Sequence, residues 1–486
     1  MSVIDNSKIE QKSRSPKVYK AHKIAIFYNL KPVLFVLLLP IIKALINSLL
    51  RREINGFFLS ESLILAVLFT YGVLKWRNFS ISITDNLVKV SSGLFLRRTA
   101  EISVDKISTI QRVRTLPDRI FGSTTLTINT EAGRKGKADY KMRLCRVDAD
   151  EIYNTLSGTT TAKTLKFSPL RVAVMSAAAS SAFTGIILIV PAIKTAGNLL
   201  GTAIEEALID RINEVSLINR LFPPIINTIT IIFLSLYGVA VAVSFFRSVN
   251  FKVSIGSGKI EISNGLLTLR KISFKKKTVN CAVIEQAPLM RMCKRYLVRV
   301  GVGGYGDNKG NKGVVVPSAK RNEVHELFGA VFPNVQKPET LIRPSIKARP
   351  RFHFKPTIFT AIMLAVYIVL SDKFPAFDEL IIFGGIIAAI VLVYYYTLAE
   401  YNARRSAIGI SNIIYAKYTH WAATREMFCE ADRIGIINIT KWPLDRKIGT
   451  CNIKLTVRSE NAESIRVKHI DYDEIKEQLS DFYKFE

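Results

Sequence analysis

The sequence has few of the residue patterns that support enzyme chemistry. None of its five histidines lies at metal-ligand spacing from another, and no nucleophile-elbow, zinc-protease or Walker motif occurs. The cysteines are odd in number and form no C-x-x-C pair, so they predict neither a disulfide framework nor a zinc site: Cys145, Cys281, Cys293, Cys429 and Cys451. These absences favour a protein without catalytic activity, metal or other cofactor.

Acidic residues are also scarce. The chain has 68 Lys and Arg against 39 Asp and Glu, a formal net charge of +29, while 49% of its residues are apolar. The apolar residues gather into long runs, which is typical of a membrane protein whose basic surface faces anionic lipid head groups. Nucleic acid is the other common partner of such charge. Because no recognition motif accompanies the charge, we expect membrane lipids and no nucleic acid as partners.

The long apolar runs occur in three pairs. Crossing a bilayer takes about 20 apolar residues, so the pairs predict six transmembrane helices in three hairpins, at 24–75, 170–246 and 356–399. An acidic, amphipathic outer loop is expected at 199–220. Lys75, Trp76 and Arg77 end the second run, and cations around a tryptophan are typical anchors at a membrane interface.

The basic residues next to these runs predict the orientation. Lys and Arg are most frequent on the side of the two termini, and the positive-inside rule places that side in the cytoplasm. We therefore expect a multi-pass protein of the bacterial plasma (inner) membrane with both termini cytoplasmic. Residues 1–23 are expected to form a basic disordered N-terminus, and 336–355 a basic, proline-containing linker.

A β-rich block follows each apolar pair, at 76–166, 247–335 and 400–486. TDNLVKVSSGLFLRRT and GSGKIEISNGLLTLRK place a glycine between two strand patterns, at Gly93 and Gly265. LPDRIFG and PLDRKIG share a second motif, and the third block is otherwise the most divergent. The residues of this second motif are Asp118, Arg119 and Gly122 in the first block and Asp445, Arg446 and Gly449 in the third.

This repeat resembles the bacterial pleckstrin-homology (PH) domain membrane proteins, in the long form with three PH-like domains. The resemblance implies a mixed α and β membrane protein in which each pair of spans is followed by a cytoplasmic PH-like β-barrel or sheet with a C-terminal helix. It implies no enzymatic activity and no cofactor. It also assigns Gly93, Gly265 and the shared D-R-x-x-G residues a structural role in the repeat.

The middle block carries the densest basic clusters. Six cations are candidate contacts for anionic lipid or for a partner protein: Lys275, Lys276, Lys277, Arg291, Lys294 and Arg295. Near a membrane each such cation contributes about 1 kcal/mol of attraction to anionic lipid. The alternative is a solvated face combined with ordinary topology signals.

Together these features favour a non-catalytic membrane scaffold whose PH-like domains bind a partner protein and anionic lipid. The resemblance also implies a role in envelope stress or antimicrobial resistance. The partner it implies is a second PH-domain membrane protein, or another copy of this chain. The alternative is a lipid or small-molecule transporter or channel component built on the six spans. The spans carry little embedded charge and show no pair of broken helices, which argues against transport.

Overall fold

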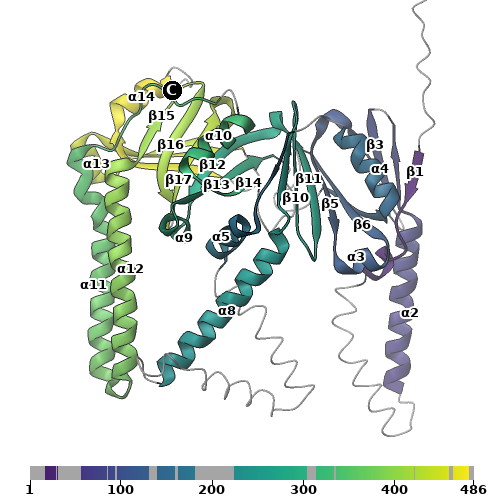
Figure 1. The fold of residues 1–486 in the computed structure, drawn as a ribbon, viewed down its shortest axis with the longest axis horizontal. Coiled ribbons are helices and arrows are strands. Elements are labelled where there is room, and N and C mark those ends of the chain that lie inside the picture. Colours follow the sequence, from purple (N-terminus) through teal and green to yellow (C-terminus); the bar gives the residue numbers. More distant parts are fainter. Residues whose placement is uncertain are drawn as a thin grey trace, which may run out of the picture.

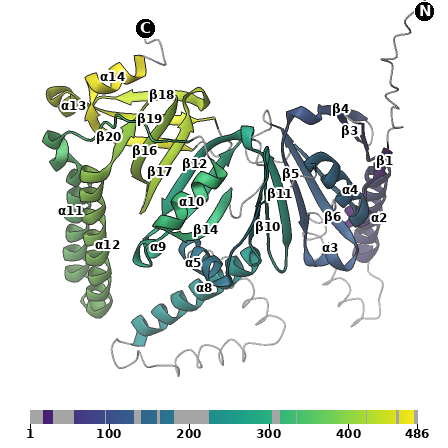
Figure 2. The ribbon, with the colours of Figure 1, turned by 45° about the horizontal axis from the view of Figure 1, so that its top comes forward.

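The structure is a computed structural model that describes most of the β-rich blocks and part of the helices. The described residues are 17–28, 30, 56–84, 86–93, 96–130, 139–158, 163–180, 224–303, 313–332, 335–420, 422–458 and 463–480. Three β-domains lie in a row, and helices leave the row on one side (Figures 1 and 2). We call these helices stems 1, 2 and 3, after the β-domain that each precedes along the chain.

β-domain 1 consists of two sheets covered by one helix. Its elements are β1 (Lys17–Lys20), α2 (Gly56–Arg77) of stem 1, β2 (Ser80–Ile83), β3 (Leu87–Ser92), β4 (Arg98–Ser103), η1 (Val104–Lys106), β5 (Ile107–Arg114), α3 (Leu116–Ile120), β6 (Ser123–Thr130), β7 (Tyr140–Cys145) and α4 (Arg146–Ser157). Val88 and Val90 alternate with exposed residues along β3, so one face of that strand is buried. Ile152, Tyr153 and Leu156 recur at helical spacing and cover the core.

β-domain 2 repeats this order after stem 2. Its elements are β8 (Lys163–Lys166), α5 (Pro169–Ala179) and α8 (Pro224–Ser248) of the stem, β9 (Lys252–Ile255), β10 (Lys259–Asn264), β11 (Leu269–Lys275), η2 (Lys276–Thr278), β12 (Val279–Gln286), α9 (Pro288–Met292), β13 (Arg295–Val302), β14 (Val314–Lys320) and α10 (Arg321–Val331). Val172 and Met175 of α5 belong to the same core as the strands. The first helix of stem 2 is therefore partly built into its β-domain.

β-domain 3 follows two long helices, α11 and α12, and α12 is the longest helix of the described chain. Its elements are η3 (Ile346–Ala348), α11 (Arg349–Lys373), η4 (Pro375–Phe377) and α12 (Asp378–Arg405) of stem 3, β15 (Ala407–Gly409), β16 (Ile413–His420), β17 (Ala423–Glu430), η5 (Ala431–Arg433), β18 (Ile434–Thr440), α13 (Pro443–Ile448), β19 (Thr450–Val457), β20 (Ser464–Asp471) and α14 (Tyr472–Ser480). Ile475 and Leu479 of α14 are buried four residues apart, so this helix closes the domain as α4 closes the first.

Two sheets are shared between neighbouring domains, which the sequence did not predict. The strand orders are β1-β2-β3-β4, β7-β6-β5-β11-β10-β9-β8, β14-β13-β12-β17-β16-β15 and β18-β19-β20. β5 of the first domain pairs with β11 of the second, and β12 of the second pairs with β17 of the third. Hydrogen-bonded ladders therefore join the three domains into one row.

Each shared sheet packs its two faces on two different cores. Cys281 and Val283 of β12 lie in the core of β-domain 3, whereas Ala282 and Ile284 of the same strand lie in the core of β-domain 2. Because successive strand residues point to opposite faces, one strand serves both domains. A hinge at this position would have to open two cores at once.

A short strand precedes each stem and pairs with the first strand after it. β1 pairs with β2, β8 pairs with β9, and Ile342 forms an isolated bridge with Ile408 in the third domain. The expected disordered segment 1–23 thus contains β1, while residues 1–16 lie outside the described residues. The expected linker 336–355 likewise contains this bridge, η3 and the start of α11. Each stem is inserted between two paired strands, which ties its base to the sheet.

The prediction of six transmembrane helices in three hairpins is wrong. In the part of the chain that the structure describes, two helices are long and apolar enough to cross a membrane, Ile346–Lys373 and Ile381–Arg405. About half of the first predicted hairpin (31–55) and the middle of the second (181–223, including the expected loop 199–220) lie outside the described residues. α5 ends at Ala179, and its apolar side chains partly serve the domain core. Part of the apolar run that predicted a membrane span at the start of the second hairpin is therefore core of β-domain 2.

Candidate membrane-contact site

A short helix follows the first strand of the second sheet in every domain. These are α3, α9 and α13, and we call them the tip helices. Each begins with a proline in its first turn, where the missing N–H leaves no hydrogen bond unmade. α9 contacts α5 of stem 2, and α3 and α9 lie on the side from which the stems leave the row (Figure 1).

The tip helices expose large apolar side chains. Ile120 is 80% exposed, Met292 is 80% exposed, and Trp442, the residue just before α13, is 65% exposed. Phe121 and Leu289 beside them are exposed as well. Exposed apolar side chains thus occur at the tip helix of all three domains, at the end of α3 and α9 and at the start of α13, and they indicate a surface that meets lipid or another protein.

Basic residues accompany these apolar side chains. Arg119 and Arg446 are exposed on α3 and α13, and Arg119 also donates a hydrogen bond of 3.2 Å to the backbone oxygen of Leu266 in the next domain. Lys447 follows Arg446 and is exposed too. An exposed apolar group beside cations is the chemistry of an interfacial membrane contact.

A buried carboxylate holds α3 in place. Asp118 is fully buried and accepts hydrogen bonds from the hydroxyls of Thr115 and Ser123, both at 2.7 Å, and from the Thr115 backbone N–H at 3.1 Å. Arg143 of β7 lies 3.8 Å away and places its guanidinium over the ring of Tyr28. Burial alone would raise the pKa of Asp118, but these hydrogen bonds and Arg143 hold it below its usual value.

Asp445 occupies the equivalent place in β-domain 3. It accepts from the Trp442 backbone N–H at 3.1 Å and forms an ion pair with Arg351 near the base of stem 3. The Nδ1 atom of His469 lies 3.2 Å from its carboxylate, and Phe352 packs edge-on against that imidazole. Burial tends to raise the pKa of Asp445, but the hydrogen bonds and Arg351 lower it overall.

The partners of the two aspartates also correspond. The backbone oxygen of Arg143 accepts from the His22 N–H at 2.8 Å, and that of His469 accepts from the Ser345 N–H at 3.0 Å. Both donors lie just before a stem. Burial lowers the pKa of His469 below its usual value, while the bond to Asp445 opposes that shift. Arg143, Arg351 and His469 were missed in the sequence, because they lie far along the chain from the motif that carries the aspartates.

The middle domain has an apolar version of the same site. Met290 takes the place of the aspartate and is buried, and Ser318 takes the place of Arg143 and is buried as well. Lys294 replaces the motif glycine and keeps its left-handed backbone, with φ 52° against 69° at Gly122 and 73° at Gly449. No charged pair therefore occupies this position in β-domain 2.

The six basic candidates of the middle block lie at two separate places. Lys275, Lys276 and Lys277 lie at η2, at one end of β12, and Arg291, Lys294 and Arg295 lie around α9 at the other. A strand of this length spans about 26 Å, so the two groups cannot contact one lipid head group together. The guanidinium of Arg291 lies over the rings of Tyr394 and Tyr401 of α12. Of the two groups, the one around α9 lies on the stem side (Figure 1).

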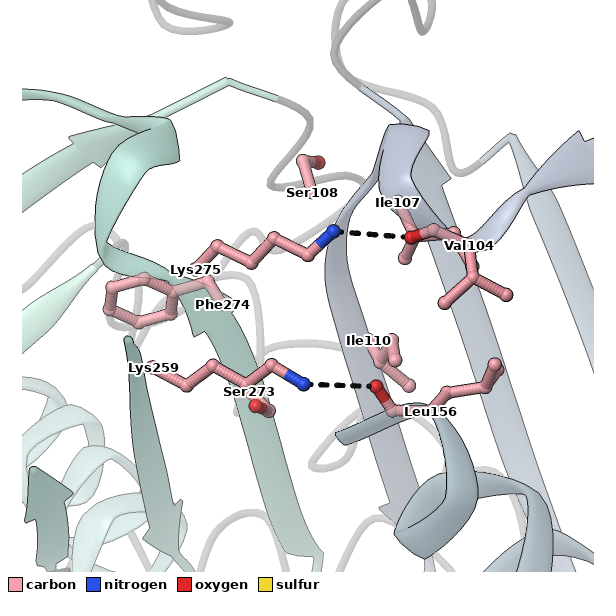
Figure 3. A pocket seen from close by; sticks show the side chains of 9 residues that line it. All are labelled: Val104, Ile107, Ser108, Ile110, Leu156, Lys259, Ser273, Phe274 and Lys275. Carbon is pink, nitrogen blue, oxygen red and sulfur yellow. Dashed lines mark hydrogen bonds between the residues drawn. The ribbon is translucent and has the colours of Figure 1, made fainter. Parts of the chain in front are cut away.

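Lys275 instead connects two domains. Its Nζ donates to the backbone oxygens of Val104 and Asp105 at 3.1 and 3.0 Å, and Lys259 Nζ donates to those of Leu156 and Ser157 at 3.3 and 2.7 Å. Figure 3 shows both lysines crossing a narrow pocket between β-domains 1 and 2. The pocket is thus an interdomain joint filled by lysine side chains, not a ligand cavity.

The remaining motif residues have local roles. Gly93 and Gly265 have φ of 138° and 103°, and a Cβ there would lie 2.0 Å from the oxygens of Leu96 and Thr268. These turns therefore require glycine. Lys75, Trp76 and Arg77 end α2 next to β-domain 1, where the Trp76 indole donates to the Ala21 backbone oxygen at 2.6 Å. Among the described residues no three or more His, Cys, Asp or Glu side chains gather into a metal site.

Comparison with known proteins gives two matches. Residues 32–160 and 186–334, together more than half of the chain, match the family described as "Bacterial PH domain". The transmembrane protein YdbT of Bacillus subtilis (strain 168) is 22% identical over 332 residues, which cover 62% of this chain and 66% of YdbT, just under two thirds of its length. The third β-domain lies beyond both matched segments of the family.

Proposed function

This chain belongs to the bacterial PH domain family, and we propose that it is a non-catalytic membrane scaffold. Its stems would anchor a row of three PH-like domains on the cytoplasmic face of the bacterial plasma membrane. Its domains would hold a partner protein there, with the tip helices in contact with anionic lipid. Membrane association itself is supported by the transmembrane relative and by the two long apolar helices.

The observation that carries this proposal is the pair of shared sheets. Ladders between β5 and β11 and between β12 and β17 hold the three domains in one row, and all stems leave that row on one side (Figure 1). A linear row of similar domains presents repeated surfaces at a set spacing, which raises the effective concentration of a partner that binds more than one of them. The pocket at the first joint is crossed by the side chains of Lys259 and Lys275.

The lipid contact is the part of the proposal that is most directly testable. Trp442 would lie among lipid head groups. A tryptophan in place of Ile120 or Met292 would report the same contact at the other two tip helices. Asp432 is the matched control, because it is exposed and lies at the other end of β18 from Trp442, about 23 Å away.

The experiment uses the full chain with one tryptophan at a time, in vesicles that contain phosphatidylglycerol brominated near the head group. We expect strong quenching for Trp442, Ile120→Trp and Met292→Trp and weak quenching for Asp432→Trp. Replacing Arg446 and Lys447 with Gln should reduce the quenching of Trp442 in anionic vesicles more than in zwitterionic ones. Equal quenching at all four positions would rule out the tip helices as the lipid contact.

A further inference from the structure

The two ends of the row carry strand edges that match each other. β4 pairs only with β3 and β18 pairs only with β19 among the described residues. Elsewhere the strands equivalent to β4 are β11 and β17, and those equivalent to β18 are β5 and β12. Each of these four strands is paired across a domain joint. One end of the row therefore lacks the strand that the other end supplies.

Both internal joints use the same register. In the first joint Ile272, four residues before η2, lies opposite Gln111, five residues after η1. In the second joint Met427, four residues before η5, lies opposite Val283, five residues after η2. The two joints therefore pair equivalent strands with the same register.

We infer that copies of this chain associate head to tail, with β18 of one copy pairing with β4 of the next. The same register sets Asn438, five residues after η5, opposite Ala100, four residues before η1. It also sets Ile436 opposite Ile102. This inference rests on the proposed scaffold function and deepens it by naming a second copy as the partner at both ends.

Burial along the equivalent strands supports this pairing. Thr109 is 1% exposed and lies opposite Phe274 of the next domain, and Cys281 is 2% exposed and lies in the core of the next domain. Ile436 occupies the same position in β18 and is 56% exposed. A second copy would cover this side chain on the face that carries Ile102, which is buried in the core of β-domain 1. Exposed strand edges of this kind are templates for pairing with another chain.

The membrane does not obstruct this association. The two internal joints leave all three stems on the same side of the row (Figure 1). A third joint of the same geometry would therefore place the second copy in the same membrane. Because the surfaces in contact differ, the assembly is heterologous, and it grows into a ring or an open row.

Cysteine cross-linking tests the register directly. Cys145 and Cys293, the two exposed cysteines, are replaced with Ser, and two differently tagged full-length copies carry Ala100→Cys and Asn438→Cys. Residues directly opposite in a sheet have Cβ atoms about 5 Å apart, so we expect an oxidised dimer that contains both tags. Glu101→Cys is the matched control, because it points to the other face of β4 and should cross-link with Asn438→Cys far less.

Three results would overturn the inference. They are no cross-link in the membrane, equal cross-linking by Glu101→Cys, and capture of a different protein by Asn438→Cys. A second measurement is the mass of the wild-type assembly in native lipid discs. Ile436→Lys should shift it toward single chains, whereas Val18→Lys, on the opposite edge of the same sheet as β4, should not. The cross-link reports contact between copies whether or not the tip helices touch lipid, so the two proposals can fail separately.

Discussion

The outer stems and the middle stem are attached to their β-domains in different ways. Stems 1 and 3 meet their β-domains at a buried carboxylate, Asp118 or Asp445, with a cation beside it. Stem 2 meets its domain through Val172 and Met175, which pack into the core near the buried Met290. The same backbone turn can therefore be held by charge or by apolar packing.

This difference has a physical cost and a benefit. A buried ion pair gains little net stability over apolar residues of similar volume, because both charges must lose their water. It does require particular partners, so it specifies which segment lies at the base of the stem. The outer stems gain that specificity, and the middle stem gains packing. In the middle domain Arg291 instead lies over Tyr394 and Tyr401 of stem 3, so β-domain 2 is linked to two stems.

The largest effect should come from placing the charge in the apolar version. Met290→Asp would bury a carboxylate in a place where β-domain 1 provides Arg143 but β-domain 2 has only Ser318. We expect β-domain 2 to lose about 3–5 kcal/mol of stability, measured as faster hydrogen exchange of β13 and β14 amides in the full chain. Adding Ser318→Arg should restore part of the loss. Unchanged exchange in the Met290→Asp variant would contradict the comparison.

A smaller effect should follow from removing the charge at an outer base. Asp118→Ala would leave the guanidinium of Arg143 buried and the hydroxyls of Thr115 and Ser123 without their acceptor. We expect β-domain 1 to lose about 3 kcal/mol, read from hydrogen exchange of β6 and β7. The double change Asp118→Met and Arg143→Ser copies the middle domain and should cost about 1 kcal/mol or less. A double variant that is as unstable as Asp118→Ala would show that the two versions are not interchangeable.

The sequence predicted the motif residues of the site, but it did not predict the sheets that join the three domains. Asp118 and Asp445 stand out because they share a short motif with a glycine four residues later, which local comparison can detect. Their partners Arg143 and His469 lie in a later strand of variable sequence, so only an alignment of the three blocks by structure places them. Family membership, and with it the PH-like class of the blocks, followed from the same short motifs.

The shared sheets escaped prediction because pairing between domains leaves no periodic signal of its own. One trace was present. Cys281 to Ile284 form a continuous apolar run in β12, which indicates a strand buried on both faces. The spans were overestimated for a related reason, because Val172 and Met175 read as membrane residues although they serve a domain core.

The smallest effect should be a difference in pH response between the two outer bases. Burial lowers the pKa of His469, so the folded domain prefers the neutral imidazole. As pH falls below about 6.5, the ordinary histidine pKa, the unfolded chain takes up this proton first, and β-domain 3 should become less stable. Arg143 at the same place in β-domain 1 keeps its charge throughout. Asp118 and Asp445 have lowered pKa values, so their contribution is lost only in strong acid, below the ordinary aspartate pKa of about 3.9.

Hydrogen exchange between pH 7.5 and 5.5, corrected for intrinsic rates, separates the two bases. We expect protection of β20 to fall with pH while protection of β7 stays constant, and His469→Gln should remove the dependence from β20. If β7 and β20 lost protection together, the cause would be a change common to the whole row and not the imidazole at the base of stem 3. Because β17 and β12 share a sheet, a loss that begins at β20 should reach β12 before it reaches β5, and the order of loss would show how far the joints transmit a local change.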